Sequence, residues 1–116
     1  MPTERRAEKL NVLLREELSK IVDREVDFSE DCLATITRAA VSPDGRYAKV
    51  FFTVFGGSEQ DALARLEKQT PGVQRLINRK LRMRPVPKIR FLIDEEEMRR
   101  EAIEKSLAEI KKKGEM

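Results

Sequence analysis

The chain of 116 residues contains no histidine and one cysteine, Cys32. A single cysteine cannot form an internal disulfide, and without histidine the common zinc and haem ligand sets are missing. No stretch is apolar over the length of a membrane span, and the charged N-terminus MPTERRAEKL lacks the apolar run of a signal peptide. These absences predict no metal, no cofactor and no membrane contact, and they favour a reducing cytoplasm.

Catalytic motifs are missing as well. Gly56 and Gly57 lack the spacing and the Lys-Ser/Thr pair of a loop that grips nucleotide phosphates. The many acids have no histidine, nucleophile motif or glycine-framed serine to work with. We therefore expect a binding protein and not an enzyme.

Charge is abundant but unevenly placed. Charged residues make up 39% of the chain, yet the net charge is only +3. Acids concentrate in 23–31 and 94–101. The window 72–93 has no acid and seven cations, which are Arg75, Arg79, Lys80, Arg82, Arg84, Lys88 and Arg90. Such a local positive field indicates an anionic partner.

Apolar spacing predicts the elements of the first half. Thr3 caps a helix that reaches about residue 24, because its apolar residues recur at steps of three and four. β-branched residues and alternation predict strands at 33–41 and 47–55, and Pro43-Asp44-Gly45 suits a tight turn between them. One face of the second strand should enter the core, with Ala48, Val50, Phe52 and Val54.

The second half alternates helices and a strand. Ser58 begins a helix to about Gln69, Thr70-Pro71-Gly72 interrupts it, and helical spacing resumes from Val73 to Met83. A strand follows at 88–93. Acids at the start and lysines at the end predict a last helix from Glu95 to about Lys113, whose thin apolar stripe indicates loose docking or fraying. The fold class is therefore α+β in the order α β β α α β α, within one domain.

Cations dominate one side of the helix predicted at 73–83. At about 100° per residue, Arg75, Arg79 and Arg82 share a narrow sector, and Lys80 snorkels at the edge of the apolar side. A solvated helix face is the alternative, but such faces interleave both signs. Guanidinium forks suit phosphate oxygens, so the pattern favours nucleic acid. RNA is preferred, because no helix-turn-helix, zinc finger or basic zipper is present.

Further cations accompany the predicted strands. Lys49, Lys88 and Arg90 lie on the outward face of the sheet, beside Tyr47 and Phe51. This arrangement predicts either a second RNA surface, in which rings stack on bases, or a plain exposed sheet. Arg46 directly follows the tight turn, where it either touches phosphate or has no function.

Several linked stretches resemble one family. The hairpin TITRAAVSPDGRYAKVFFTV, the break TPG between the central helices and the stretch LRMRPVPKIRFLID are together similar to ribosome-binding factor A, a bacterial small-subunit assembly protein. The resemblance spans roughly residues 4 to 94. It implies a KH-like domain of type II, with helices on one face of a three-stranded sheet. It also implies binding to the 16S rRNA of the immature 30S subunit and a role in rRNA processing, maturation and cold adaptation.

The resemblance also directs attention to the kink. The family replaces the Gly-x-x-Gly loop of RNA-clamping KH domains with a kink of Ala-x-Gly form, and this chain has Thr70-Pro71-Gly72, with Thr in place of Ala. We expect a KH-like RNA-binding domain at 1–94 and a C-terminal helical extension at 95–116. The candidate RNA-binding residues are Gly72, Arg75, Arg79, Lys80, Arg82, Arg84, Arg46, Lys49, Lys88 and Arg90.

These expectations describe a monomeric, non-enzymatic ribosome assembly factor in the cytoplasm. The alternative from another class is a protein-interaction module, in which the basic helix face and the last helix dock an acidic partner.

Overall fold

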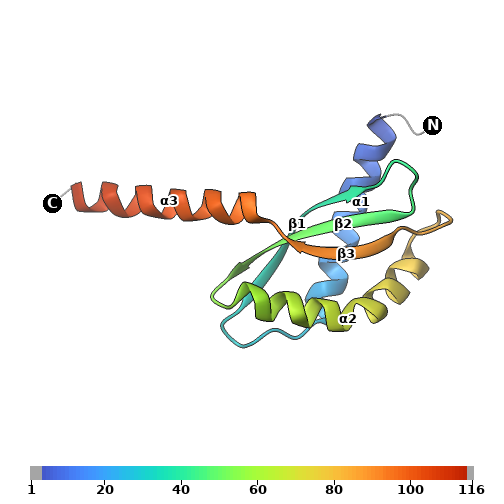
Figure 1. Cartoon of the computed structure of the whole chain (residues 1–116), viewed down its shortest axis with the longest axis horizontal. Coiled ribbons are helices and arrows are strands. Elements are labelled where there is room, and N and C mark those ends of the chain that lie inside the picture. The colour runs from blue at the N-terminus through green and yellow to red at the C-terminus, as the bar shows by residue number, and fades with distance from the viewer. Residues whose placement is uncertain (1–3, 115–116) are drawn as a thin grey trace.

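The computed structural model describes residues 4–114, so the predicted cap Thr3 lies outside the described residues. The elements are α1 (Glu4–Glu25), β1 (Leu33–Val41), β2 (Tyr47–Phe55), α2 (Glu59–Lys80), β3 (Lys88–Ile93) and α3 (Glu95–Gly114), as labelled in Figure 1. All three predicted strands are confirmed at the expected residues. The α+β class, with helices against a three-stranded sheet and an additional C-terminal helix, is confirmed as well.

The sheet has the order β1-β2-β3, with β1 and β2 antiparallel and β2 and β3 parallel. The tight turn after β1 explains the antiparallel pair. Gly45 takes a φ of 73°, and the Asp44 carboxylate accepts hydrogen bonds from the Ser42 hydroxyl at 2.6 Å and the Arg46 amide at 3.1 Å. The parallel pair requires a long crossover, which α2 supplies.

The core lies on one face of the sheet. Strand side chains alternate, and the predicted inward set Ala48, Val50, Phe52 and Val54 is buried, together with Ile89 and Phe91 of β3. Leu14, Leu18 and Val22 of α1 and Leu66, Val73 and Ile77 of α2 cover this face at helical spacing. The opposite face of the sheet receives neither helix.

The helices predicted on either side of Thr70-Pro71-Gly72 form the single element α2, which runs through Pro71. Pro71 has no amide hydrogen, so the carbonyl four residues earlier loses its usual helical bond. The Thr70 hydroxyl donates to the Leu66 carbonyl at 2.7 Å, a contact that also favours bending. Figure 1 shows that the second half of α2 takes a different direction from the first.

The predicted end of this helix at Met83 was wrong. Leu81 has extended backbone angles, φ −86° and ψ 137°, and α2 ends at Lys80. Arg82 therefore does not share a helix face with Arg75 and Arg79, contrary to the prediction. Leu81 is nevertheless buried, at 5% exposure, so its apolar character reflects the core and not a continuing helix.

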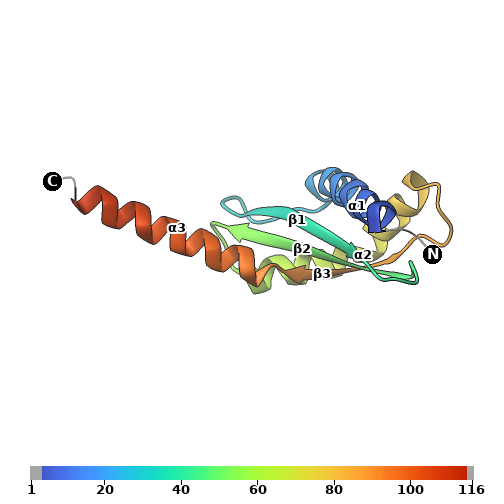
Figure 2. The same cartoon turned by 90° about the horizontal axis from the view of Figure 1, so that it is seen from above.

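The last helix, α3, extends away from the body of the molecule, as Figures 1 and 2 show from two directions. Its first turn is held to the sheet, because Asp94 caps it and the Met98 sulfur lies 3.3 Å from the Val54 amide. The rest of the predicted stripe is exposed, including Ile103, Leu107 and Ile110. Within residues 4–114, no helix combines the length and apolar character needed to cross a membrane.

Candidate nucleic-acid interface

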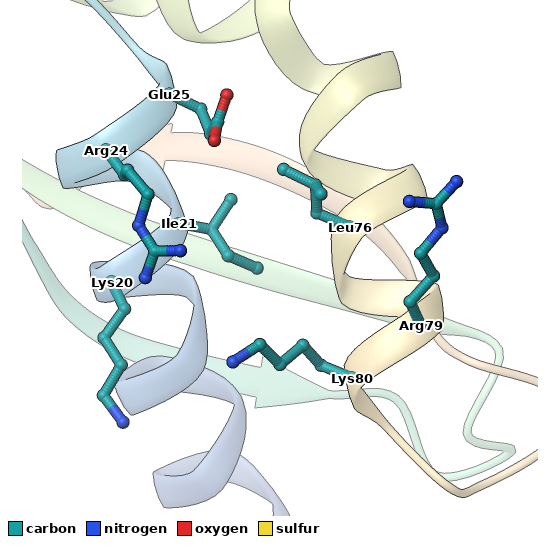
Figure 3. Close-up of a pocket in the computed structure, with 7 residues that line it drawn as sticks. All are labelled: Lys20, Ile21, Arg24, Glu25, Leu76, Arg79 and Lys80. Atoms are coloured by element: carbon teal, nitrogen blue, oxygen red, sulfur yellow. The ribbon is translucent and has the colours of Figure 1, made fainter.

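A groove separates α1 from the second half of α2. One hollow of about 240 Å³ is lined by Lys20, Ile21, Arg24, Glu25, Leu76, Arg79 and Lys80. Figure 3 shows Ile21 and Leu76 directed toward one another across it, while Lys80 reaches toward α1 and the Arg79 guanidinium extends outward. Ile21 is 5% exposed, so the floor is apolar and the charges lie on the rim.

A second hollow of about 260 Å³ continues the groove toward the bend of α2. It is lined by Glu25, Gln69, Gly72, Val73, Arg75, Leu76 and Arg79, so three residues are common to both hollows. We refer to the two together as the α1–α2 groove. The bend matters here, because it places Gly72 and Arg75 beside the end of α1.

Both lysines that line the groove, Lys20 and Lys80, are paired with the same acid. The Glu17 carboxylate on α1 lies 3.5 Å from the Lys20 Nζ and 3.7 Å from the Lys80 Nζ. Its Oε2 atom is buried and accepts no hydrogen bond among the described residues, so the Lys80 charge compensates it only at a distance. Lys80 therefore has a structural role in addition to any role in binding.

The arginines of the groove have no such partner. Among residues 4–114, no carboxylate lies within ion-pair distance of Arg75, Arg79 or Arg24. All three are exposed. No acid of 23–31 or α3 forms an ion pair with them, and Glu25 is the one carboxylate among the lining residues (Figure 3). The groove therefore presents three guanidinium groups and one acid above an apolar floor. Forked, weakly hydrated cations of this kind bind phosphate oxygens in pairs of hydrogen bonds.

The predicted RNA-binding residues separate into groups. Gly72, Arg75, Arg79 and Lys80 come together in the α1–α2 groove. Lys49, Lys88 and Arg90 lie on the opposite, open face of the sheet, and Arg46 lies beside them at the turn, where its carbonyl accepts a hydrogen bond from the Lys88 amide at 2.8 Å. Arg82 and Arg84 occupy the segment between α2 and β3.

Arg84 is engaged with the backbone. Its guanidinium donates to the Leu81 carbonyl at 3.0 Å and to the Met83 carbonyl at 2.8 Å, which stabilises the exit from α2. Arg82 is exposed and has no ion pair within the described part of the chain. Arg84 is exposed as well, but its hydrogen bonds to the two carbonyls both use one guanidinium nitrogen, so Arg82 is the less engaged of the two.

The sequence reasoning missed Lys20 and Arg24, which complete the groove from α1. They are four residues apart and therefore lie on one side of that helix. This spacing could be read from the sequence, but it does not by itself predict a binding surface. The prediction rested on a window that holds cations and no acid, whereas α1 interleaves both signs. Only the packing of α1 against α2 brings these two residues to the groove.

The order α1-β1-β2-α2-β3, with two helices on one face of a three-stranded sheet, defines a KH-like domain of type II. A model of one protein family matches residues 6–107, and its description is Ribosome-binding factor A. The chain belongs to this family.

Individual relatives agree with the assignment. The ribosome-binding factor A of Natranaerobius thermophilus is 39% identical over 92 residues, covering 78% of this chain and 70% of the relative. That of Thermomicrobium roseum is 35% identical over 96 residues, covering 81% and 74%.

Solved structures agree with the fold. The crystal structure of ribosome-binding factor A from Thermus thermophilus has a TM-score of 0.68 and 25% identity, and the match covers 75% of this chain and 94% of that chain. A homology model of the Thermus thermophilus factor, fitted into a cryo-EM map of a 30S complex, has a TM-score of 0.62 at 24% identity. This match covers 71% of this chain and 88% of that one, and it supports the fold alone.

Proposed function

We propose that this chain binds the 16S rRNA of the immature 30S subunit and assists its maturation in the cytoplasm, without catalysing a reaction. The observation that carries the proposal is the pair Arg75 and Arg79, exposed at the α1–α2 groove without a carboxylate partner in residues 4–114. The family and the 30S complex of the Thermus thermophilus factor supply the class of target.

The groove suits a sugar-phosphate backbone for two reasons. Guanidinium groups on α2, together with Arg24 on α1, offer hydrogen bonds to phosphate oxygens. The apolar floor of Ile21 and Leu76 can contact the ribose, and it lowers the local dielectric beneath the charges, which strengthens their attraction to an anion. At Gly72 the missing side chain allows the RNA backbone to approach α2 closely.

The test removes charge from the groove and, in a matched control, from elsewhere. An Arg75→Gln, Arg79→Gln variant is compared with Lys68→Gln, Arg99→Gln, which loses the same charge from exposed sites outside the groove. Binding to immature 30S subunits is measured over a range of salt concentrations. Two lost phosphate contacts should flatten the log-log salt slope by about 2 in the groove variant. Equal slopes and affinities in both variants would show that the groove is not the binding surface.

A protein-interaction module remains the second candidate, and the exposed stripe Ile103, Leu107 and Ile110 of α3 is the observation that favours it. Ribonuclease treatment separates the two functions. Association that survives digestion of the RNA supports a protein partner, whereas loss of association supports direct contact with rRNA.

A further inference from the structure

The face of the sheet opposite α1 and α2 carries a second cluster of cations. We call it the open sheet face and define it by Arg38, Tyr47, Lys49, Phe51, Lys88 and Arg90. Tyr47 is 59% exposed, and Lys49, Lys88 and Arg90 are exposed as well. No part of this cluster lines the α1–α2 groove.

Strand pairing places like charges directly opposite one another. Lys49 on β2 pairs with Arg90 on β3, and Tyr47 pairs with Lys88. Of these two pairs only Lys49–Arg90 joins like charges, which repel one another at this spacing and so oppose the pairing of the two parallel strands. Among residues 4–114, no carboxylate lies within ion-pair distance of these three cations, so the fold itself gains nothing from the arrangement. An anionic ligand would remove this cost.

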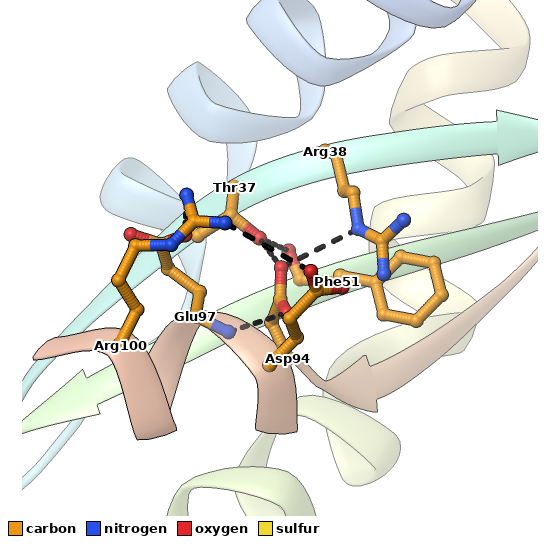
Figure 4. Close-up of polar contacts among 7 residues, drawn as sticks. Thr37, Arg38, Phe51, Asp94, Glu97 and Arg100 are labelled. Atoms are coloured by element: carbon orange, nitrogen blue, oxygen red, sulfur yellow. Dashed lines mark hydrogen bonds and ion pairs between the residues drawn. The ribbon is translucent and has the colours of Figure 1, made fainter. Parts of the chain in front are cut away.

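Asp94, at the end of this face, does not supply the missing negative charge. Its side chain is buried and engaged, since Oδ2 accepts a hydrogen bond from the Thr37 hydroxyl at 2.7 Å and lies 3.4 Å from the Arg38 Nε (Figure 4). It compensates Arg38 and leaves the three cations of β2 and β3 uncompensated.

Planar groups interleave with the charges. Tyr47 and Phe51 lie on the same face of β2, with Lys49 between them. The Arg38 guanidinium lies over the Phe51 ring, 4.1 Å from its centroid (Figure 4), and the Arg38 side chain is 54% exposed, so its outer side is available for stacking. Rings and guanidinium planes among cations are the elements that bind unpaired bases and their phosphates.

We propose that the open sheet face binds a single-stranded RNA segment. Bases stack on Tyr47 and on the Arg38–Phe51 pair, while Lys49, Lys88 and Arg90 hold the phosphates. Duplex RNA is excluded from this mode, because its bases are stacked inside the helix and out of reach of the rings. The inference rests on the proposed RNA-binding function and adds a second surface with a different preference.

The chain provides its own probe for this contact. Tyr47 is its only tyrosine, and the sequence has no tryptophan. Stacking of a base on the ring shortens the fluorescence lifetime of that one residue. The experiment titrates the full chain with an oligouridylate of about ten nucleotides, a length within the range of single-strand sites, and then with a duplex of equal length.

The proposal expects the oligouridylate to shorten the lifetime saturably and the duplex to leave it unchanged. Tyr47→Leu and the Lys49→Gln, Arg90→Gln pair should each weaken oligouridylate binding about tenfold, as measured by calorimetry. Thermal unfolding of each variant verifies the fold. Oligouridylate binding without a lifetime change, or an equal lifetime change with an acidic polyglutamate peptide, would overturn the proposal.

The groove variant Arg75→Gln, Arg79→Gln separates this inference from the proposed function. It should retain the lifetime response to oligouridylate while losing affinity for 30S subunits. If it loses both responses together, the two faces do not bind RNA independently and the inference fails. If it keeps full affinity for 30S subunits, the groove assignment fails, while a retained lifetime response to oligouridylate still supports the sheet face.

Discussion

Replacing Asp94 with alanine should cost about 2 kcal/mol of the free energy of unfolding, because the side chain joins the start of α3 to β1. Its Oδ1 accepts a hydrogen bond from the Glu97 amide at 3.1 Å and so caps α3. Its Oδ2 accepts the Thr37 hydroxyl of β1 at 2.7 Å and lies 3.4 Å from the Arg38 Nε. The backbone of Asp94 continues the sheet, since its amide donates a hydrogen bond to the Phe52 carbonyl at 2.8 Å, and this bond is kept in the alanine variant.

The magnitude can be divided among these contacts. Loss of the helix cap costs about 1 kcal/mol. Loss of the hydrogen bond from the Thr37 hydroxyl costs about another 1 kcal/mol, the net value of one such bond, since the hydroxyl keeps the Phe51 carbonyl at 3.3 Å as an acceptor. The ion pair with Arg38 contributes at most a few tenths of a kcal/mol, since the arginine side chain is 54% exposed and the pair is screened by solvent. At roughly 4 °C per kcal/mol for a chain of this size, the melting temperature should fall by about 8 °C.

Urea unfolding, followed by far-ultraviolet circular dichroism, measures the loss. Asp23→Ala is the control, because Asp23 is an exposed aspartate on α1 and should show no such loss. Thr37→Val alone should cost about 1 kcal/mol, and it should cost less when Asp94 is already alanine, since the two share one hydrogen bond. A loss below about 0.5 kcal/mol for Asp94→Ala would refute the role of this residue as a junction.

Three other perturbations test the same structure. Burial raises the pKa of Asp94, but the hydrogen bonds of its carboxylate and the nearby guanidinium outweigh burial, so the net pKa is lowered. The contribution of Asp94 to the free energy of unfolding is therefore complete above about pH 4 and is lost as the pH falls through the folded pKa. Urea unfolding from pH 7 to pH 3 should therefore show a shallower decline for Asp94→Asn. Gly72→Ala should stabilise the helix by about 0.5 to 1 kcal/mol, since a Cβ there meets nothing within 4 Å, yet weaken 30S binding in sedimentation if RNA approaches its backbone. Gly56→Ala should lose more stability than Gly45→Ala in thermal unfolding, because both have positive φ but only at Gly56 would a Cβ collide with a backbone carbonyl.

Much of the fold could be predicted because burial and periodicity agree. In β2 every second residue from Ala48 to Val54 is buried, so the period of two identifies both the strand and its inward face. The end of α2 could not be predicted in this way. Leu81 continues the four-residue spacing of Val73 and Ile77 and is buried like them, but it is buried from an extended backbone. Apolar spacing reports burial and does not report where the backbone leaves the helix.

The candidate groove was only half predictable for a different reason. Arg75 and Arg79 belong to the stretch 72–93, which has seven cations and no acid, so the sequence alone predicts them as a basic surface. Lys20 and Arg24 join them from more than fifty positions away, through packing that no local pattern encodes. The junction at Asp94 was likewise hidden, because it depends on an irregularity in β1 between Ile36 and Arg38.

The acids of this chain explain which cations remain available. Glu17 lies between Lys20 and Lys80, and Asp94 holds Arg38. Each of these acids is largely buried, so each must be compensated for the fold to be stable. Among the cations without an ion pair in residues 4–114, two groups lie on opposite surfaces: Arg24, Arg75 and Arg79 in the groove, and Lys49, Lys88 and Arg90 on the open sheet face. Folding does not require these cations there, and like charges at close range oppose folding, which supports the proposal that both surfaces bind a polyanion.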